Sequence, residues 1–306
     1  MLIMLAIVAV SCVNDTEQPA TRAGSLFSFR SVEVAGVGTG MKYHGTIATW
    51  NNGAGSWYYA PNSPYRTEWS CEFVNGSGVV SAERNRHYYP EGEYDFYLLG
   101  VNNSNIDITP DANGRVAVVG GAEGGNDYIW ATVSAEVDGK KDIEVTPEFT
   151  HLFGQVSFEL KVRGIGDVPS EMVSFDGLDQ LGYCTRGTVD ITKGEFVENS
   201  GSDVLSDSDI TLGKRYMVIP GVGGNYCDIT VTIDGKAYPV SINKGNTKIT
   251  AGKRSVILFV YNGFGVSMVE IPQWSIGEDI SIDRTEGDGY DIPQWQPESD
   301  LPQENK

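Results

Sequence analysis

The sequence predicts an all-β protein built from antiparallel β-sandwiches or barrels, and three observations support this fold class. First, apolar and polar residues alternate with period 2 in short segments: Tyr94, Phe96 and Leu98 share one face, and Glu93 and Asp95 share the other. Second, turn-forming residue pairs fall between these segments. Third, no long stretch has the apolar spacing of an amphipathic helix.

The predicted strands follow one another along the chain. Segments 156–162 and 229–233 alternate cleanly, and 254–261 is almost continuously apolar, as expected for a central strand covered on both faces. The other predicted strands are 25–34, 43–50, 55–60, 68–74, 115–119, 128–137, 142–146, 187–192 and 214–219. Turns are predicted at Asn52-Gly53, Asn75-Gly76, Asn113-Gly114, Asp138-Gly139, Asp176-Gly177 and Asp234-Gly235.

The composition is that of a folded, acidic protein. The 306 residues include 41 acidic and 22 basic side chains, a net charge of −19, and 40% of them are hydrophobic. This apolar content supports a packed core, and the negative field repels phosphate backbones, so we expect no nucleic-acid partner. Asp203, Asp207 and Asp209 lie close together but lack the spacing of a calcium-binding loop. We therefore interpret the acidity as solubility of an exposed surface, with a calcium-requiring assembly as the alternative.

The N-terminal residues predict export and a lipid anchor. Residues 1–11 are an unbroken apolar run, shorter than the roughly 20 residues of a membrane-spanning helix and typical of a signal peptide. Small residues precede Cys12, as in a bacterial lipobox. We predict that Cys12 is lipidated, and that this lipid is the protein's attachment to the membrane.

The predicted organisation has five parts. Residues 1–12 are the lipoprotein signal peptide and 13–22 a polar tether. An N-terminal β-sandwich over 23–147 and a C-terminal β-sandwich over 148–283 follow, because a new long strand begins just after Thr146 and Pro147. Residues 284–306 form an acidic tail with little strand pattern.

The sequence contains no catalytic or metal-binding motif, so we predict that the protein is not an enzyme and has no catalytic residue, metal ligand or cofactor. The three histidines, each isolated, are His44, His87 and His151. The cysteines that remain after Cys12 are odd in number and show no CxxC spacing; they are Cys71, Cys184 and Cys227. Buried thiols are the default interpretation, and pairing of Cys184 with Cys227 stays open.

Aromatic residues crowd into one short stretch, and they allow two interpretations. The members that define this candidate aromatic patch are Trp50, Trp57, Tyr58 and Trp69. If exposed, they are suited to stacking on sugars; if buried, they belong to the core, where an aromatic ring hides about 150–250 Å². We favour the core for most of them.

Several segments taken in order resemble the fimbrillin family, the lipid-anchored, protease-matured pilus subunits of certain Gram-negative anaerobes. The first is the signal peptide with Cys12, followed by Ala20-Thr21-Arg22-Ala23 and a strand with alternating Phe27 and Phe29. The aromatic segment Tyr88–Tyr97 is similar to a turn and strand of the family's N-terminal domain, and Phe149–Phe158 to the first strand of its C-terminal domain. The segment Tyr216–Pro220 and the late Trp274 complete the resemblance.

The resemblance implies two tandem transthyretin-like antiparallel β-sandwich domains and a function as a structural subunit or associated adhesin of a pilus on the cell outer membrane. Its implied partners are other pilus subunits, a trypsin-like maturation protease, and host or bacterial surface receptors or glycans. The protease would cut at Arg22, with Arg30 as the second candidate, so that residues 13–22 become a removable strand. The alternative, suggested by the aromatic patch, is a glycan-binding surface lipoprotein.

The resemblance also implies that one subunit donates a strand to the next by β-augmentation. The C-terminal region repeats Ile-Pro-Gln-Trp at 271–274 and 292–295, and alternating residues precede the first copy. Proline is better tolerated in an edge or donated strand than in a central one. The candidate donor-strand residues are Val266, Met268, Ile271, Trp274, Ile292 and Trp295.

Overall fold

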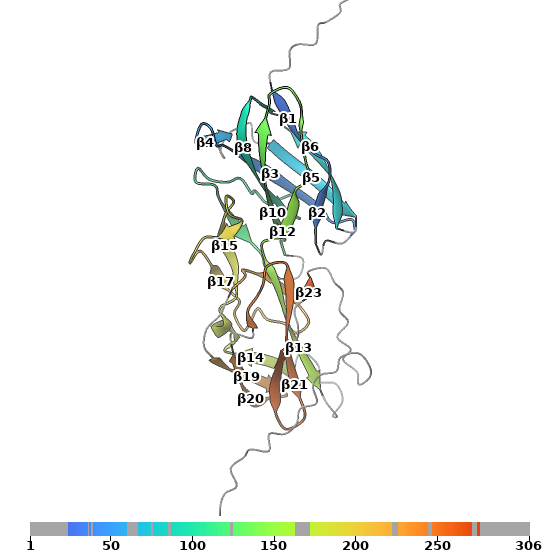
Figure 1. The fold of residues 1–306 in the computed structure, drawn as a ribbon. Helices are drawn as coiled ribbons and strands as arrows, with labels where there is room; N and C mark the ends of the chain where they lie inside the picture. The colour runs from blue at the N-terminus through green and yellow to red at the C-terminus, as the bar shows by residue number, and fades with distance from the viewer. Residues whose placement is uncertain are drawn as a thin grey trace, which may run out of the picture.

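The computed structural model describes residues 24–275, except 36, 38, 60–66, 75, 85–86, 123–124, 163–171, 222–225, 244–246 and 271–273. The described residues form β-strands and one short 3-10 helix, which confirms the all-β prediction (Figure 1). None of their helices has the length and hydrophobicity that a bilayer crossing requires.

The elements of the N-terminal half are β1 Ser25–Phe29, β2 Val32–Val34, β3 Lys42–Asn51, β4 Ser56–Tyr59, β5 Thr67–Val74, β6 Ser77–Arg84, β7 Tyr88–Tyr89, β8 Gly92–Val101, β9 Arg115–Val119, β10 Tyr128–Val137, β11 Ile143–Val145 and β12 Glu148–His151. Those that follow are β13 Gly154–Val162, β14 Val173–Asp176, η2 Leu178–Leu181, β15 Cys184–Asp190, β16 Glu195–Phe196, β17 Ser202–Val204, β18 Arg215–Val218, β19 Tyr226–Ile233, β20 Lys236–Asn243, β21 Lys253–Tyr261, β22 Val266–Glu270 and β23 Trp274–Ser275.

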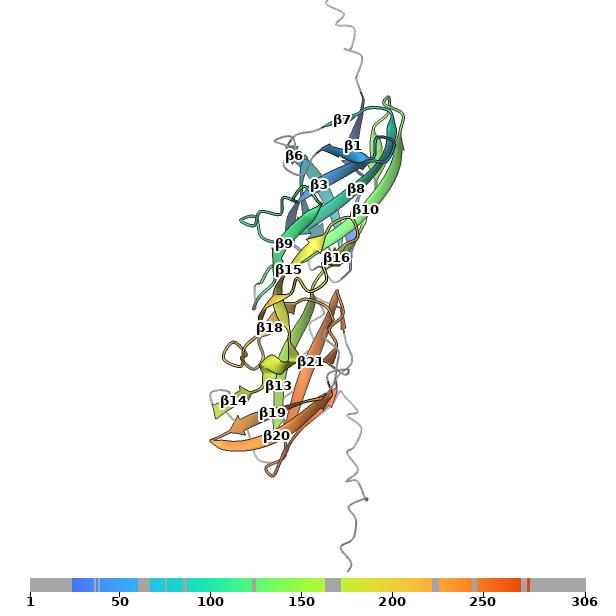
Figure 2. The ribbon, with the colours of Figure 1, turned by 90° about the vertical axis from the view of Figure 1, so that its left-hand side faces the viewer.

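In the N-terminal half, strands are hydrogen-bonded into a closed ring. The order is β3-β5-β6-β2-β12-β10-β8, and β8 pairs again with β3. Strand β4 adds to the end of β3, and a small sheet of β11, β1 and β7 lies at the end of this half (Figure 2). Closure leaves these strands without a free edge, except where β4 and the ends of the short strands project.

The apolar residues at alternate positions of β8 pack inside this ring, as predicted: Tyr94, Phe96 and Leu98 are all buried. Trp69 is fully buried as well, and its indole lies over two glycines on adjacent strands. A Cβ on Gly45 would come within 2.3 Å of Trp69 Cε2, and one on Gly100 within 2.4 Å of Trp69 Cη2. These glycines therefore create the space that the largest side chain of this core occupies, a role that the sequence pattern did not reveal.

The C-terminal half contains two facing sheets. One has the order β18-β13-β21-β22, and the other the order β14-β19-β20. Apolar side chains from both sheets form the core between them, with Phe158, Val231 and Phe259 at 0% exposure. Strand β13 runs parallel to β21 over eight residue pairs, so β21 is a central strand, as its apolar run predicted.

The two halves share a sheet and a third apolar cluster. Strand β9 pairs with β15 over five residue pairs, although β9 lies before residue 147 and β15 after it. Residues from both halves, including Leu99, Val118, Phe153 and Val189, form the cluster at this junction. Such an apolar junction restricts motion between the halves. The boundary between 147 and 148 stays a prediction.

Replacing Gly45 by alanine is expected to destabilise the protein by about 3 kcal/mol, because overpacking a core typically costs about 1–3 kcal/mol and here backbone must also shift. The new Cβ would lie 2.1 Å from the Leu99 carbonyl oxygen. Gly53→Ala is the matched control, since its Cβ would meet nothing closer than 3.5 Å. Chemical denaturation measures both; equal effects would show that the Trp69 packing is not the cause.

Candidate functional site

Strand β1 lies at the end of the N-terminal half (Figures 1 and 2), hydrogen-bonded to β11 on one side and to β7 on the other. We call the position that it occupies between these two strands the slot of β1. Strand β1 pairs in parallel with β11 over residues 27–29 and antiparallel with β7 over residues 25–26. The Leu26 backbone N–H donates to Asp142 Oδ1 at 3.1 Å, and Ser28 Oγ donates to the Ile143 carbonyl at 3.1 Å. The strand pairings with β11 and β7 are made by backbone groups, a kind of contact that any extended segment can make, and each of these two hydrogen bonds adds one side-chain atom.

The side chains of β1 fill the slot. Phe27 is buried, and its ring stacks on Phe96 with centroids 4.2 Å apart, while Phe29 meets Phe27 edge to face at 5.2 Å. Gly24, just before the strand, has φ +135°, and a Cβ there would lie 2.7 Å from the Tyr89 carbonyl oxygen. Strand β1 therefore covers the core of the N-terminal half with apolar side chains, and we call it the plug. The residue before it, Gly24, has a backbone conformation and surroundings that require glycine.

The plug ends at an exposed arginine. The Arg30 side chain is 73% exposed and pairs with Glu144 Oε2 at 2.7 Å, an ion pair in solvent that holds the side chain weakly. Its backbone N–H donates to the Val145 carbonyl at 2.8 Å. Arg30 thus lies in the short link between β1 and β2, with its charged group accessible from solvent.

Three of the candidate donor-strand residues lie in strands of the C-terminal sheet. Val266 and Met268 belong to β22, which pairs with β21 of the same chain at the edge of its sheet, and both side chains pack against the C-terminal core. Trp274 belongs to β23 and pairs with Arg254. The predicted sites outside the described residues are Cys12, Arg22, Ile271, Ile292 and Trp295.

The aromatic patch splits between the core and the surface. Trp69 is 1% exposed and contacts Phe149 with ring centroids 5.2 Å apart. Tyr58 is half-buried and packs against the N-terminal core. Trp50 and Trp57 are also half-buried and meet edge to face at 5.3 Å, so they form a partly exposed aromatic pair.

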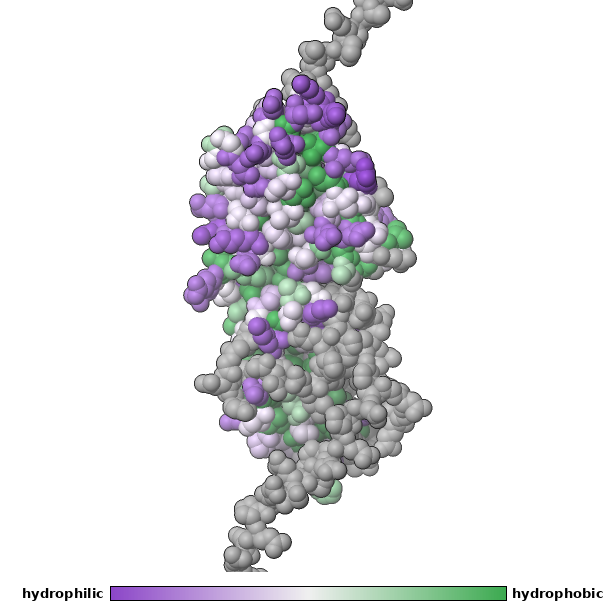
Figure 3. Space-filling view, viewed as in Figure 1, coloured by the Kyte–Doolittle hydropathy of each residue, from purple (hydrophilic) through white to green (hydrophobic). Residues whose placement is uncertain are grey.

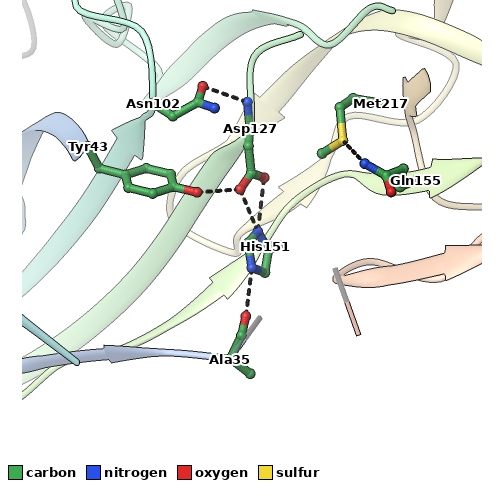
Figure 4. A network of polar contacts seen from close by, with 7 residues as sticks. All are labelled: Ala35, Tyr43, Asn102, Asp127, His151, Gln155 and Met217. Carbon is green, nitrogen blue, oxygen red and sulfur yellow. Dashed lines mark hydrogen bonds and ion pairs between the residues drawn. The ribbon is translucent and has the colours of Figure 1, made fainter. Parts of the chain in front are cut away.

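A buried polar network that the sequence did not predict lies near the junction (Figure 4). Asp127 accepts a hydrogen bond from Tyr43 Oη at 2.5 Å and lies 2.8 Å from His151 Nδ1. His151 Nε2 lies 2.8 Å from the Ala35 carbonyl oxygen, and the Asp127 backbone N–H donates to Asn102 Oδ1 at 2.9 Å. The network joins β3, β12, the start of β10 and the turn after β2.

Both nitrogens of His151 face acceptors, a carboxylate and a carbonyl, so both are suited to donate. Burial by itself lowers the pKa of His151, but the Asp127 charge and the hydrogen bonds to Asp127 and Ala35 outweigh burial and raise the pKa. Because Nε2 is bound to a carbonyl, the pair does not activate a nucleophile as a catalytic dyad does. Its geometry fits a structural ion pair.

The acidic residues at 203–209 and the cysteines show ordinary structural contacts. Asp207 accepts from the backbone N–H groups of Gly177 and Leu178, and Asp203 pairs with Arg186 at 2.7 Å. No group of three or more potential metal ligands occurs among the described residues. Among the described residues, no disulfide joins Cys71, Cys184 or Cys227. Burial raises the pKa of Cys71 to about 12.

Solved structures of other proteins share this fold. Two solved structures match most of the chain: a proposed cell adhesion protein of Bacteroides uniformis (TM-score 0.52, 14% identity, 80% of this chain and 96% of that one) and one of Bacteroides ovatus (TM-score 0.53, 13% identity, 85% and 100%). At this identity they show a shared fold. No curated protein sequence matches significantly.

The model of the fimbrillin-like family matches residues 38–274. Since the match spans more than half of the 306 residues, the chain belongs to the fimbrillin-like family, as its sequence motifs predicted. The visible face of the N-terminal half carries many hydrophilic side chains, in keeping with an exposed surface (Figure 3).

Replacing His151 by glutamine is expected to lower the free energy of unfolding by about 3 kcal/mol at about pH 5.5, because Asp127 loses its buried cation. The folded-state pKa of His151 is raised, so its stabilisation is fully present below the unfolded pKa of about 6.5 and is lost as the pH rises through the folded pKa. Denaturation curves from about pH 5.5 to about pH 9 should therefore show a difference that shrinks with pH. His44→Gln, at a half-buried histidine, is the control. If the difference in unfolding free energy between the unsubstituted protein and His151→Gln were the same at every pH in this range, the charged Asp127–His151 pair would be contradicted.

Proposed function

We propose that this protein is a structural subunit of a cell-surface pilus, or an adhesin associated with it, and that it assembles by strand exchange. The single observation that carries the proposal is the slot of β1. Removing β1 would unpair backbone groups of β11 and β7 and uncover Phe96. An extended segment of another subunit with apolar side chains at alternate positions would restore the same contacts. Such a function is structural and needs no catalytic group.

The proposed pathway begins with lipidation of Cys12 and transport to the outer membrane surface. A trypsin-like protease then cuts the chain at an arginine. Arg22 is the candidate from the sequence motif, and Arg30 is supported by its exposed side chain and its place directly after β1. Only a cut after Arg30 separates β1 from the rest of the chain, so we propose Arg30 as the cut that opens the slot. Arg22 stays a candidate for an earlier step.

Purified protein from residue 13 onward should form ladders or filaments when treated with a trypsin-like protease. Arg30→Gln is expected to abolish assembly, whereas Arg22→Gln should retain it. Arg186→Gln is the matched control, because Arg186 is 53% exposed and also pairs with a carboxylate, Asp203. Assembly by an Arg22→Gln/Arg30→Gln double variant at the rate of the unsubstituted protein would refute cleavage-driven assembly. Cleavage without any oligomer would refute the pilus proposal itself.

The donated segment is proposed to come from the tail beyond residue 284, where Ile292 and Trp295 supply apolar side chains. Deleting 284–306 should abolish polymerisation and change the melting temperature little. Ile292→Ser/Trp295→Ser should have the same effect in the full chain, with Gln294→Ser as the control. Assembly by the deleted protein would mean that the donor lies elsewhere, and failure to fold would mean that the tail belongs to the C-terminal sandwich.

Glycan binding is the second candidate function, and the half-buried Trp50–Trp57 pair favours it. The Trp57 ring also meets the Tyr97 ring edge to face, with centroids 5.8 Å apart, so the aromatic contacts extend over three strands, β3, β4 and β8. Exposed parts of such rings stack on sugar faces. Receptors and glycans recognised in this way are compatible with a pilus adhesin.

A further inference from the structure

The outer face of the N-terminal ring carries three aromatic rings in contact. Tyr97 of β8 alternates with the buried Phe96, so its side chain points out of the ring of strands. The Tyr97 ring meets the Trp57 ring edge to face, and Trp57 meets Trp50 in the same way, with centroids 5.8 and 5.3 Å apart. All three residues are half-buried, so part of this aromatic group faces solvent.

Two carboxylates flank the aromatic group, and they come from different halves of the chain. Asp95 lies two residues before Tyr97 on β8 and points to the same face, and Asp190 is the last residue of β15. Burial raises the pKa of Tyr97, and the charges of Asp95 and Asp190 raise it further. Both carboxylates therefore lie near the Tyr97 hydroxyl. Both acidic residues are half-buried.

Each carboxylate is held in position through one of its oxygens. Asp95 Oδ1 accepts a hydrogen bond from Ser134 Oγ at 2.5 Å. Asp190 Oδ1 accepts from the backbone N–H of Thr192 at 3.0 Å and from its hydroxyl at 2.6 Å. A carboxylate has about four acceptor positions on its two oxygens, so both groups can accept further hydrogen bonds. The two acids are thus oriented before a ligand arrives.

The C-terminal half forms one side of this surface. The turn between β15 and β16 lies against β10, because Trp130 Nε1 donates to the Ile191 carbonyl at 2.7 Å (Figure 2). The same turn reaches the aromatic group at Gly114. A Cβ at Gly114 would lie 3.0 Å from Trp57 Cζ2 and 3.4 Å from Thr192 Cγ2. The rings and the two acids therefore form one surface across the junction of the halves.

We propose that this surface binds a sugar that carries no negative charge. We call it the junction site and define it by Trp50, Trp57, Asp95, Tyr97 and Asp190. A sugar ring presents an apolar face of C–H groups, which packs on aromatic rings, and hydroxyl groups at its rim, which donate to carboxylates. The inference rests on the glycan binding proposed above, and deepens it by naming the class of sugar and the acids that select it.

The charge around the junction site disfavours anionic sugars. Glu93 and Glu136 lie opposite each other on the same outer face, and both are exposed. Two basic side chains are also exposed nearby, Arg115 opposite Asp190 and Lys193 in the turn after it. With Asp95 and Asp190, four carboxylates stand against these two cations. A sulfated or sialylated sugar would add a further negative charge to a surface that is already negative.

The test is an array of immobilised glycans, probed with the uncleaved chain from residue 13 to residue 306. The array holds neutral oligosaccharides of glucose, galactose and mannose, and the same oligosaccharides carrying sialic acid or sulfate. We expect binding to neutral members, and binding at least about tenfold weaker to their acidic counterparts. The oligosaccharide that binds best is then titrated by calorimetry against the variants.

Asp95→Asn and Asp190→Asn should each weaken the affinity for this oligosaccharide at least about fivefold, because an amide replaces a charged acceptor. Asp228→Asn is the matched control, since Asp228 is exposed and also accepts from a serine of the neighbouring strand, Ser241. Asp228 lies on β19, away from the junction. These substitutions of half-buried or exposed acids are compatible with folding, which melting temperatures check.

Trp57→Ala should weaken the affinity at least about tenfold, because the central ring of the aromatic group is lost. Phe264→Ala is the control, since Phe264 is an aromatic side chain 91% exposed in the turn between β21 and β22. Should Trp57→Ala unfold, Trp50→Ala takes its place with the same expected loss.

The outcomes separate the inference from glycan binding as such. If no member of the array binds, glycan binding itself is refuted. If the tryptophan variant weakens binding but neither aspartate variant does, or if the acidic glycans bind better, the inference is overturned while glycan binding at the aromatic pair stands. Binding that no variant changes would lie elsewhere on the molecule and would overturn both.

Discussion

The N-terminal half depends on closing its ring of strands at the seam between β2 and β12, where only two residue pairs meet on each side of β2. So short a strand cannot hold a barrel closed by its own ladder. The buried Asp127–His151 pair supplies the missing connection, because it ties β12 to the turn after β2 through Ala35 and to β3 through Tyr43. The wall on which β1 packs belongs to the same ring, because Phe96, which stacks on Phe27, lies on β8.

The rest of the molecule extends this closed unit into a rod (Figures 1 and 2). Strand β9 leaves the N-terminal half to pair with β15, and Trp130 Nε1 donates to the Ile191 carbonyl across the same junction at 2.7 Å. The shared sheet and the apolar cluster make the junction continuous. The β1 slot and the β14-β19-β20 sheet lie at opposite ends. This arrangement suits a subunit that is joined head to tail.

The strands were largely predictable because period-2 alternation depends only on neighbouring residues. The stretch containing Trp69, Cys71 and Phe73 illustrates this, since all three are buried on one strand face. The aromatic patch shows the limit: local pattern does not say that Trp69 lies inside while Trp50 and Trp57 reach the surface. The burial of Trp69 depends on Gly45 and Gly100, which lie on other strands and leave the space that its indole occupies.

The sequence by itself determined the all-β class, most of the strands and membership of the fimbrillin-like family, because these follow from alternation, turns and ordered motifs along the chain. It did not predict β6 or β20, and it predicted one strand over 25–34 where the structure has β1 and β2. Only the tertiary structure decided which strands pair. Closure of the ring at β2 and β12, the crossing of β9 to β15 and the meeting of His151 with Asp127 all join distant residues. Such pairings are selected by the packing of whole sheets, and a local pattern is the same whichever partner a strand finally meets.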